Sequence, residues 1–112
     1  MTDLTPDWDF ELQQAQTAAT LHQLRSEADF PQDARVTLDL TFVPGAGADL
    51  EAATRALGMF GYAATPSEDG GFSVAVEDVA LAVDEIWLHE ERTSRIALAR
   101  GFTPDGWGFW EP

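Results

Sequence analysis

The segment that most constrains the fold is residues 35–42, RVTLDLTF, because apolar and polar side chains alternate along its whole length. Successive side chains of a β-strand point to opposite faces, so the four apolar residues from Val36 to Phe42 would share one face. The polar residues from Arg35 to Thr41 would share the other face. This pattern predicts a half-buried strand in an antiparallel sheet that has one face on the core and one in solvent.

Apolar residues that recur at intervals of three and four predict three helices, over residues 7–28, 49–60 and 83–100. Asp49 is suited to cap the start of the second helix, and Gly61 is suited to end it. The first helix is the longest, and its apolar positions indicate one buried stripe. The residues of that expected stripe are Trp8, Leu12, Ala15, Ala18, Leu21, Leu24 and Ala28.

Three further strands are expected, at residues 62–66, at residues 72–77 and in the last twelve residues, 101–112. An Asp69-Gly70 turn would join the first two of them as a hairpin. The element order is a helix followed by β-α-β-β-α-β. It predicts one α+β domain over residues 1–112, a ferredoxin-like sandwich of a four-stranded antiparallel sheet, carried by residues 35–112, with an extra N-terminal helix.

Charge is the most distinctive compositional feature of this 112-residue chain. It contains 20 acidic residues, six arginines and no lysine, which gives a formal net charge of −14. Such a chain repels phosphate backbones, so direct nucleic-acid binding is not expected, whereas a basic protein surface would be attracted to it. Cysteine is absent, and neither a signal peptide nor a membrane-spanning run is found. We therefore expect a soluble cytoplasmic protein.

The chemistry-bearing residues do not form a recognisable catalytic or metal-binding pattern. His22 and His89 lie on different predicted helices, and neither has a second ligand at metal-binding spacing. The glycine-rich PGAGAD segment, residues 44–49, lacks the Lys-Ser/Thr of a phosphate-binding loop. Neighbouring acids in this sequence are typical of solvated faces rather than of catalytic carboxylate pairs. We expect a protein that is not an enzyme and that needs no metal and no cofactor.

The C-terminal segment GFTPDGWGFWEP carries an unusual amount of apolar surface for a chain end. In a strand, Trp107 and Phe109 would share the buried face, and Gly108 and Trp110 would share the opposite one. A glycine at 106 or 108 would permit a β-bulge or the close approach of a bulky group. The segment is therefore expected to be the final strand, and the alternative is a partner-contact edge centred on Trp110.

The DGWG motif of this segment, followed by an aromatic and an acidic residue, resembles the regulator of ribonuclease activity B family, the protein inhibitors of ribonuclease E. Four other segments resemble those of the family in kind and order. They are LHQLRSEADFP, VTLDLTF, DLEAATRALGMFGY and SEDGG-FSVAVE. Pro104 departs from the aromatic residue that usually precedes the motif. The resemblance implies a ferredoxin-like fold with an added N-terminal helix and binding to the basic scaffold region of ribonuclease E. The motif residues are Asp105, Gly106, Trp107 and Gly108.

The leading hypothesis is a non-enzymatic, acidic, protein-binding regulator whose partner is a basic protein segment. The acids expected to steer that partner are Asp39, Glu77, Asp78, Glu90 and Glu91, with Trp110 as an anchor. A second hypothesis is a dimeric ferredoxin-like domain that binds a small molecule in a pocket between the sheet and the N-terminal helix. Trp87 or Trp107 would line that pocket. A third is a structural module whose acidity serves only solubility.

Overall fold

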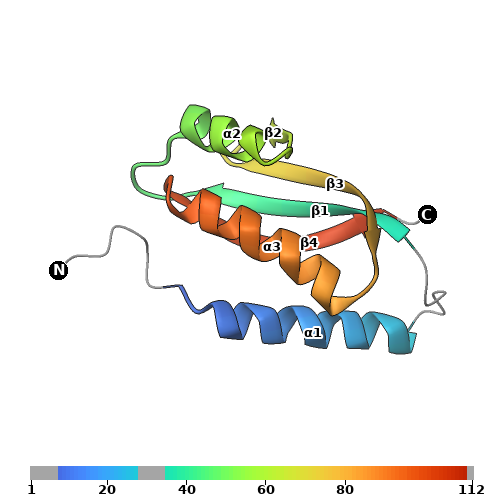
Figure 1. Ribbon diagram of the computed structural model, residues 1–112. Helices are drawn as coiled ribbons and strands as arrows, with labels where there is room; N and C mark the ends of the chain where they lie inside the picture. Colours follow the sequence, from blue (N-terminus) through green and yellow to red (C-terminus); the bar gives the residue numbers. More distant parts are fainter. Residues whose placement is uncertain (1–7, 28–34, 111–112) are drawn as a thin grey trace.

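The computed structural model describes residues 8–27 and 35–110, which form an α+β fold with three helices and one four-stranded antiparallel sheet (Figure 1). This arrangement is compatible with the predicted ferredoxin-like sandwich. The predicted helix ends at residues 7 and 28 and the chain end at 111–112 lie outside the described residues. The elements are α1 (Phe10–Glu27), β1 (Arg35–Pro44), α2 (Leu50–Met59), β2 (Ala64–Pro66), β3 (Phe72–Ala80), α3 (Val83–Leu98) and β4 (Phe102–Trp110).

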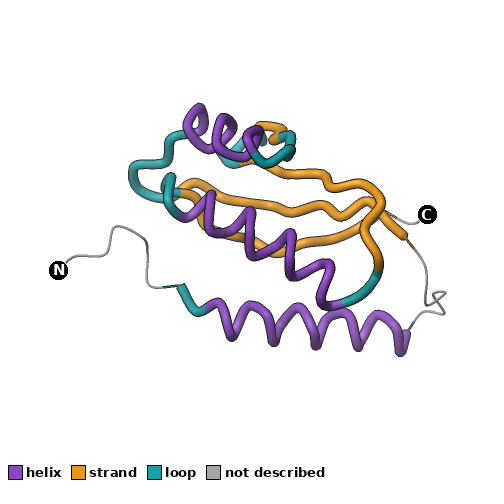
Figure 2. Tube along the Cα trace, in the orientation of Figure 1, coloured by secondary structure: helices purple, strands orange, loops and turns teal. Residues whose placement is uncertain are grey.

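The sheet has the strand order β2-β3-β1-β4, and every neighbouring pair is antiparallel. β1 is therefore central, between β3 and β4. The helices lie along one face of the sheet, with α3 against the strands, α2 on one side of α3 and α1 on the other (Figure 2). No described helix or strand covers the opposite face, which we call the open face of the sheet.

The alternation of β1 is borne out by the structure. Val36, Leu38, Leu40 and Phe42 are all buried beneath the helices, while the intervening residues are only partly buried. The ring of Phe72 stacks on that of Phe42 with 4.8 Å between the ring centres. Full burial of an aromatic or aliphatic side chain of this size stabilises a fold by about 2 kcal/mol. The inner face of β1 is thus the floor of the core.

The predicted apolar stripe of α1 is wrong for most of its residues, although Leu21 is buried in the core as predicted. Leu12 is 54% exposed, whereas the buried residues of the helix are Gln13, Thr17 and Leu21, four residues apart. Residues at this spacing share one face of a helix. That face meets α3, where Glu90 and Ser94 are also buried and polar. α1 therefore docks through the hydrogen-bonding side chains of Gln13 and Thr17 together with Leu21, rather than through a continuous apolar stripe.

The glycine-rich loop before α2 serves packing. The amide of Gly45 donates to the carbonyl of Gly101 at 2.8 Å. The amide of Asp49 donates to the carbonyl of Arg100 at 3.0 Å. The Asp49 carboxylate caps α2 by accepting a hydrogen bond from the amide of Ala52, as predicted. A carboxylate already occupies the helix start, where a phosphate-binding loop would present its free amides.

β-Bulges interrupt both neighbours of β1. Leu40 faces Trp107 while Phe42 faces Pro104, so β4 has one residue more than β1 in this interval. Gly106 lies there with φ of 97°, a conformation that side-chain-bearing residues rarely adopt. The equivalent bulge of β3 contains Asp78, with φ of 59°. Part of the DGWG motif is thus explained by backbone geometry.

We predict that Gly106→Ala destabilises the fold and that Gly108→Ala does not. A Cβ at either position would have no atom within 4 Å, so the two substitutions differ only in backbone conformation. Alanine at the positive φ of position 106 should cost about 1–2 kcal/mol. Urea unfolding of the two variants and the wild type measures the difference. Equal stabilities for both variants would contradict the assignment of the bulge to Gly106.

Candidate functional site

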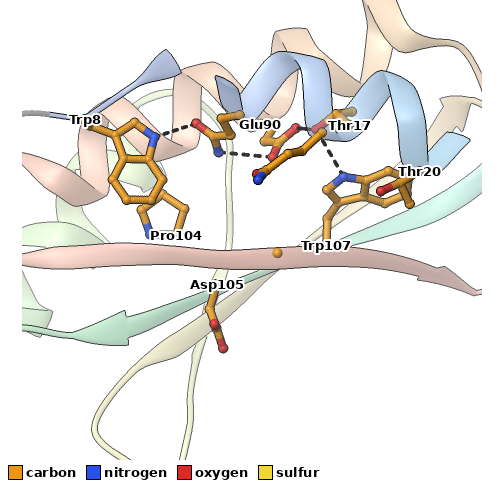
Figure 3. A pocket seen from close by; sticks show the side chains of 10 residues that line it. Trp8, Thr17, Thr20, Glu90, Pro104, Asp105 and Trp107 are labelled. Atoms are coloured by element: carbon orange, nitrogen blue, oxygen red, sulfur yellow. Dashed lines mark hydrogen bonds between the residues drawn. The ribbon is translucent and has the colours of Figure 1, made fainter. Parts of the chain in front are cut away.

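A cleft of about 480 Å³ opens between α1, α3 and β4 (Figure 3). Trp8 and Pro104 lie at one end, and Trp107 and Thr20 lie at the other. The space between them is bounded by polar side chains of the two helices. The complete lining consists of Trp8, Gln13, Gln16, Thr17, Thr20, Glu90, Pro104, Asp105, Gly106 and Trp107.

Glu90 of α3 is the charged group of this cleft that the fold buries, with 5% of its surface exposed. The Thr17 hydroxyl donates to its Oε1 at 2.5 Å, and the Gln13 side-chain amide donates to its Oε2 at 3.0 Å. The second amide hydrogen of Gln13 reaches Ser94 Oγ at 3.1 Å. Both carboxylate oxygens are therefore held by α1, which fixes that helix to α3.

Two tryptophans extend this network to the ends of the cleft. The Trp8 indole N–H donates to Gln13 Oε1 at 2.7 Å, and the Trp107 indole N–H donates to Thr17 Oγ1 at 3.3 Å. Both chains of donors lead through α1 to Glu90, which acts as the final acceptor (Figure 3). The network therefore links the DGWG tryptophan of β4 with both helices.

Burial is the main influence on the pKa of Glu90. Burial raises the pKa of this carboxyl above its ordinary value, and the hydrogen bonds from Thr17 and Gln13 act in the opposite direction. No arginine or histidine forms an ion pair with Glu90 among the described residues. The cleft thus contains a buried acid that is hydrogen-bonded but lacks a cationic partner.

A second cavity, of about 530 Å³, lies beside β3 and contains a Tyr-His-Arg cluster. The Tyr62 hydroxyl and His89 Nδ1 are 2.9 Å apart, and Arg92 donates to the same hydroxyl at 3.4 Å. Burial lowers the pKa of His89; the positive charge of Arg92 lowers it further, and Glu85 raises it. His89 is therefore held toward its neutral form, in a position separate from the cleft.

The open face of the sheet carries small polar side chains and acids. Asp39 lies on β1 between Ala75 of β3 and Gly108 of β4. Asp105 belongs to the lining of the cleft, but its side chain points from β4 away from Trp107 and Glu90 (Figure 3). Glu77 is exposed in the β3 bulge, between Val76 and Val79, which both pack on the core, so it faces away from the core and borders the second cavity. The face therefore presents a carboxylate on each of three adjacent strands.

The structure separates the predicted partner-binding acids into three groups. Asp39 and Glu77 belong to the open face. Asp78 and Glu91 are engaged in ion pairs, with Arg35 at 2.6 Å and with Arg95 at 2.9 Å respectively. Glu90 is buried between α1 and α3, so its assignment to a steering surface is wrong: its position on α3 turns it toward the polar face of α1.

The predictions for the aromatic residues differ in how the structure bears on them. Trp107 and Phe109 lie opposite Leu40 and Leu38 and pack on the core, as predicted for the inner face. The backbone of Trp110 pairs with Thr37, but its side chain lies outside what the structure describes, so its role as an anchor stays a prediction. Trp87, the other expected pocket residue, is buried and does not line the cleft.

Sequence reasoning missed Gln13 and Thr17 as site residues. The pattern that could have indicated them is the spacing of four that they share with Leu21, because it aligns two polar residues with an apolar one on one helix face. Trp8 was expected in the core rather than at a cleft. The role of Gln13 and Thr17 depends on α3, which supplies a buried acid opposite them.

The described residues contain neither a metal-binding cluster nor a membrane-spanning helix. Within residues 8–27 and 35–110, no three histidine or acidic side chains are placed to share a metal ion. In the same ranges, none of the helices combines the length and apolar character needed to cross a bilayer.

No protein-family model and no curated protein matches this sequence. The resemblance of Asp105–Gly108 to the ribonuclease regulator family therefore stays a prediction. Function has to be inferred from the cleft, the open face and their charges.

We predict that Glu90→Gln stabilises the protein at neutral pH. A carboxyl with a raised pKa in the fold holds its proton more tightly there than in the unfolded chain, so folding stability falls as pH rises above the unfolded value. A glutamine amide can accept from Gln13 and donate to Thr17, and it avoids the buried charge. We expect a gain on the order of 1 kcal/mol at neutral pH.

Urea unfolding across about pH 4 to 8 measures this effect. The control is Glu68→Gln, which removes the same charge from an exposed position. The advantage of the Glu90 variant should grow with pH and vanish at the acidic end. A gain of the same size for both variants would instead indicate a general effect of net charge.

Proposed function

We propose that this protein is a non-enzymatic, acidic regulator that binds a basic protein segment on the open face of its sheet. The observation that carries the proposal is the segregation of charge on that face. Asp39, Glu77 and Asp105 lie there on three adjacent strands, without a described hydrogen-bond partner. Unpaired acids on a surface of small side chains attract a cationic partner.

The arginines of the chain do not neutralise this surface. Four of the six lie on helices and Arg100 follows the end of α3, and each of the six contacts another group of the protein. Arg35 is the arginine of the sheet, and it is held at the end of β1 by Asp78 at 2.6 Å and Glu85 at 3.5 Å. The negative potential of the open face is therefore left for a partner.

The neighbours of Asp39 make its carboxylate accessible. Ala75 and Gly108 flank it on the two adjacent strands, and both are exposed. Because both residues are small, no bulky side chain flanks Asp39 on either strand. An extended segment with arginine or lysine could therefore approach its carboxylate. This would give Gly108 a role that its backbone conformation does not require.

The family resemblance supports a specific partner within this proposal. The strand order and the helix-covered face are compatible with a ferredoxin-like sandwich that carries α1 as an added helix. Together with the DGWG motif, they favour a relation to the regulator of ribonuclease activity B family. The proposed partner is then the basic scaffold region of ribonuclease E, in the cytoplasm, and binding would restrain RNA cleavage without contact to RNA.

The test is the triple variant Asp39→Asn, Glu77→Gln, Asp105→Asn. We expect its affinity for the basic scaffold segment to fall about tenfold or more, because several surface charge pairs of 0.2–1 kcal/mol each are lost. The matched control, Glu11→Gln, Glu68→Gln, Asp84→Asn, removes three exposed charges from other elements. Calorimetric titration at two salt concentrations measures both variants, and thermal unfolding verifies that they fold.

The wild-type affinity should also fall steeply with added salt, since exposed charges are screened. Equal losses in the two triple variants would show that only net charge matters, as expected for acidity that serves solubility. The absence of any binding by the wild-type protein would refute this partner.

A small-molecule-binding domain is the second candidate function. The cleft favours it, because it lies between α1 and β4 and is lined by Trp107, close to the position expected from the sequence. A thermal-shift screen of metabolites would detect such a ligand. Loss of the shift in a Trp107→Leu variant that still folds would assign the ligand to the cleft.

A further inference from the structure

The charge balance of the cleft differs from that of the rest of the described structure. Each of the four ion pairs joins an arginine to an acid whose side chain is at least 36% exposed. Glu90, at 5% exposure, has no such partner. Burying a carboxylate without a cation is costly, and hydrogen bonds from neutral groups offset only part of that cost. A bound cation would offset the remaining cost of burying the carboxylate.

The carboxylate of Glu90 also has unused capacity. Thr17 and Gln13 each donate one hydrogen bond, one to each oxygen, whereas an ionised carboxylate has about four acceptor positions. Glu90 lines a cleft that no described cationic side chain enters. A donor that arrives through the cleft would therefore find an acceptor.

The walls of the cleft suit the same kind of ligand. The indoles of Trp8 and Trp107 stand on either side of the Glu90–Thr17 pair (Figure 3). Their N–H groups are occupied by Gln13 and Thr17, which restrains both rings. Tryptophan is the aromatic residue that attracts cations best, and the attraction is stronger where water is excluded.

We propose that this cleft binds one organic cation, a guanidinium or alkylammonium group, between Trp8 and Trp107 and above Glu90. An anion would meet the carboxylate directly and would find no cationic residue in the lining. A neutral ligand could hydrogen-bond to the cleft but would leave the buried charge uncompensated. The volume of about 480 Å³ exceeds what one such group needs, so the cation can carry a chain that leaves through the opening.

Two sources can supply this cation, an arginine or lysine side chain of a partner and a free small cation. The first source rests on the proposed function. β4 is the edge strand that separates the cleft from the open face, since Asp105 and Trp107 point to its opposite sides (Figure 3). A basic segment on the open face could therefore pass over β4 and place one side chain in the cleft.

The experiment titrates the full-length protein with Nα-acetyl-arginine methylamide and, in parallel, with the neutral citrulline analogue. Indole N–H signals in ¹H–¹⁵N spectra report the site, and Trp→Phe variants assign them. We expect the arginine compound to shift the Trp8 and Trp107 signals in a saturable manner and to leave the signal of buried Trp87 unchanged. Equal responses to the two compounds would overturn the proposal.

Two variants test the roles of the residues. Glu90→Gln should weaken binding of the arginine compound about tenfold, and Trp8→Leu should weaken it severalfold. Glu68→Gln, the charge-matched control, should bind like the wild type. Unaltered binding by the Glu90 variant would overturn the proposal. The Trp8 change tests the aromatic wall without altering the carboxylate.

The open-face triple variant, Asp39→Asn, Glu77→Gln, Asp105→Asn, distinguishes the two sources of the cation. If the cation belongs to a partner segment, a scaffold peptide should shift the cleft signals in the wild type, and its citrulline-substituted form should not. The triple variant should keep its affinity for the small arginine compound and bind the peptide weakly. If agmatine, a free guanidinium compound, binds and the peptide leaves the cleft signals unchanged, the site is a small-cation site. That result would refute the partner source while the cation site stands.

Discussion

The pairing of β1 on both sides is the constraint on which the rest of the structure depends. Because β1 is bonded to β3 and β4, its alternating side chains divide the protein into a covered half and an open half. Leu38 and Leu40 face the helices and are almost fully buried, while Asp39 between them faces the open side. Each proposed surface is defined by its position relative to this strand. A change of register by one residue would exchange the two halves.

α1 is joined to this framework by hydrogen bonds that converge on a buried acid. An apolar interface would have tolerated sliding of the helix, whereas the pairing of Gln13 and Thr17 with the two oxygens of Glu90 permits one register. The selection of one arrangement by buried polar groups, at a cost in stability, is known from coiled coils. Here it also keeps a cleft open, because polar side chains that already have partners do not collapse into it. The hydrogen bonds that fix the position of α1 thus also maintain the cleft.

The sequence predicted what depends on local periodicity and missed what depends on contacts between elements. β1 alternates because one face is uniformly buried, and the cap of α2 needs only Asp49 and its own backbone, so both were predictable. The stripe of α1 was not, since its counterpart on α3 is polar and helix periodicity alone does not reveal that partner. The sequence alone predicts both Glu90 and its neighbour Glu91 as surface acids. Adjacent residues on a helix are about 100° apart, which is enough to bury the first and expose the second.

The DGWG motif connects the two proposed surfaces. A different physical property explains the residue type at each of its positions. Asp105 and Trp107 point to opposite sides of β4, although only one residue lies between them. In a regular strand, residues two apart would share a face. The bulge at Gly106 removes that relation and allows a carboxylate on the open face to stand next to an indole in the cleft. Gly108 lies opposite Asp39 and places no side chain beside that carboxylate. A basic segment that crosses this edge strand could therefore contact Asp105 on the open face and Trp107 in the cleft.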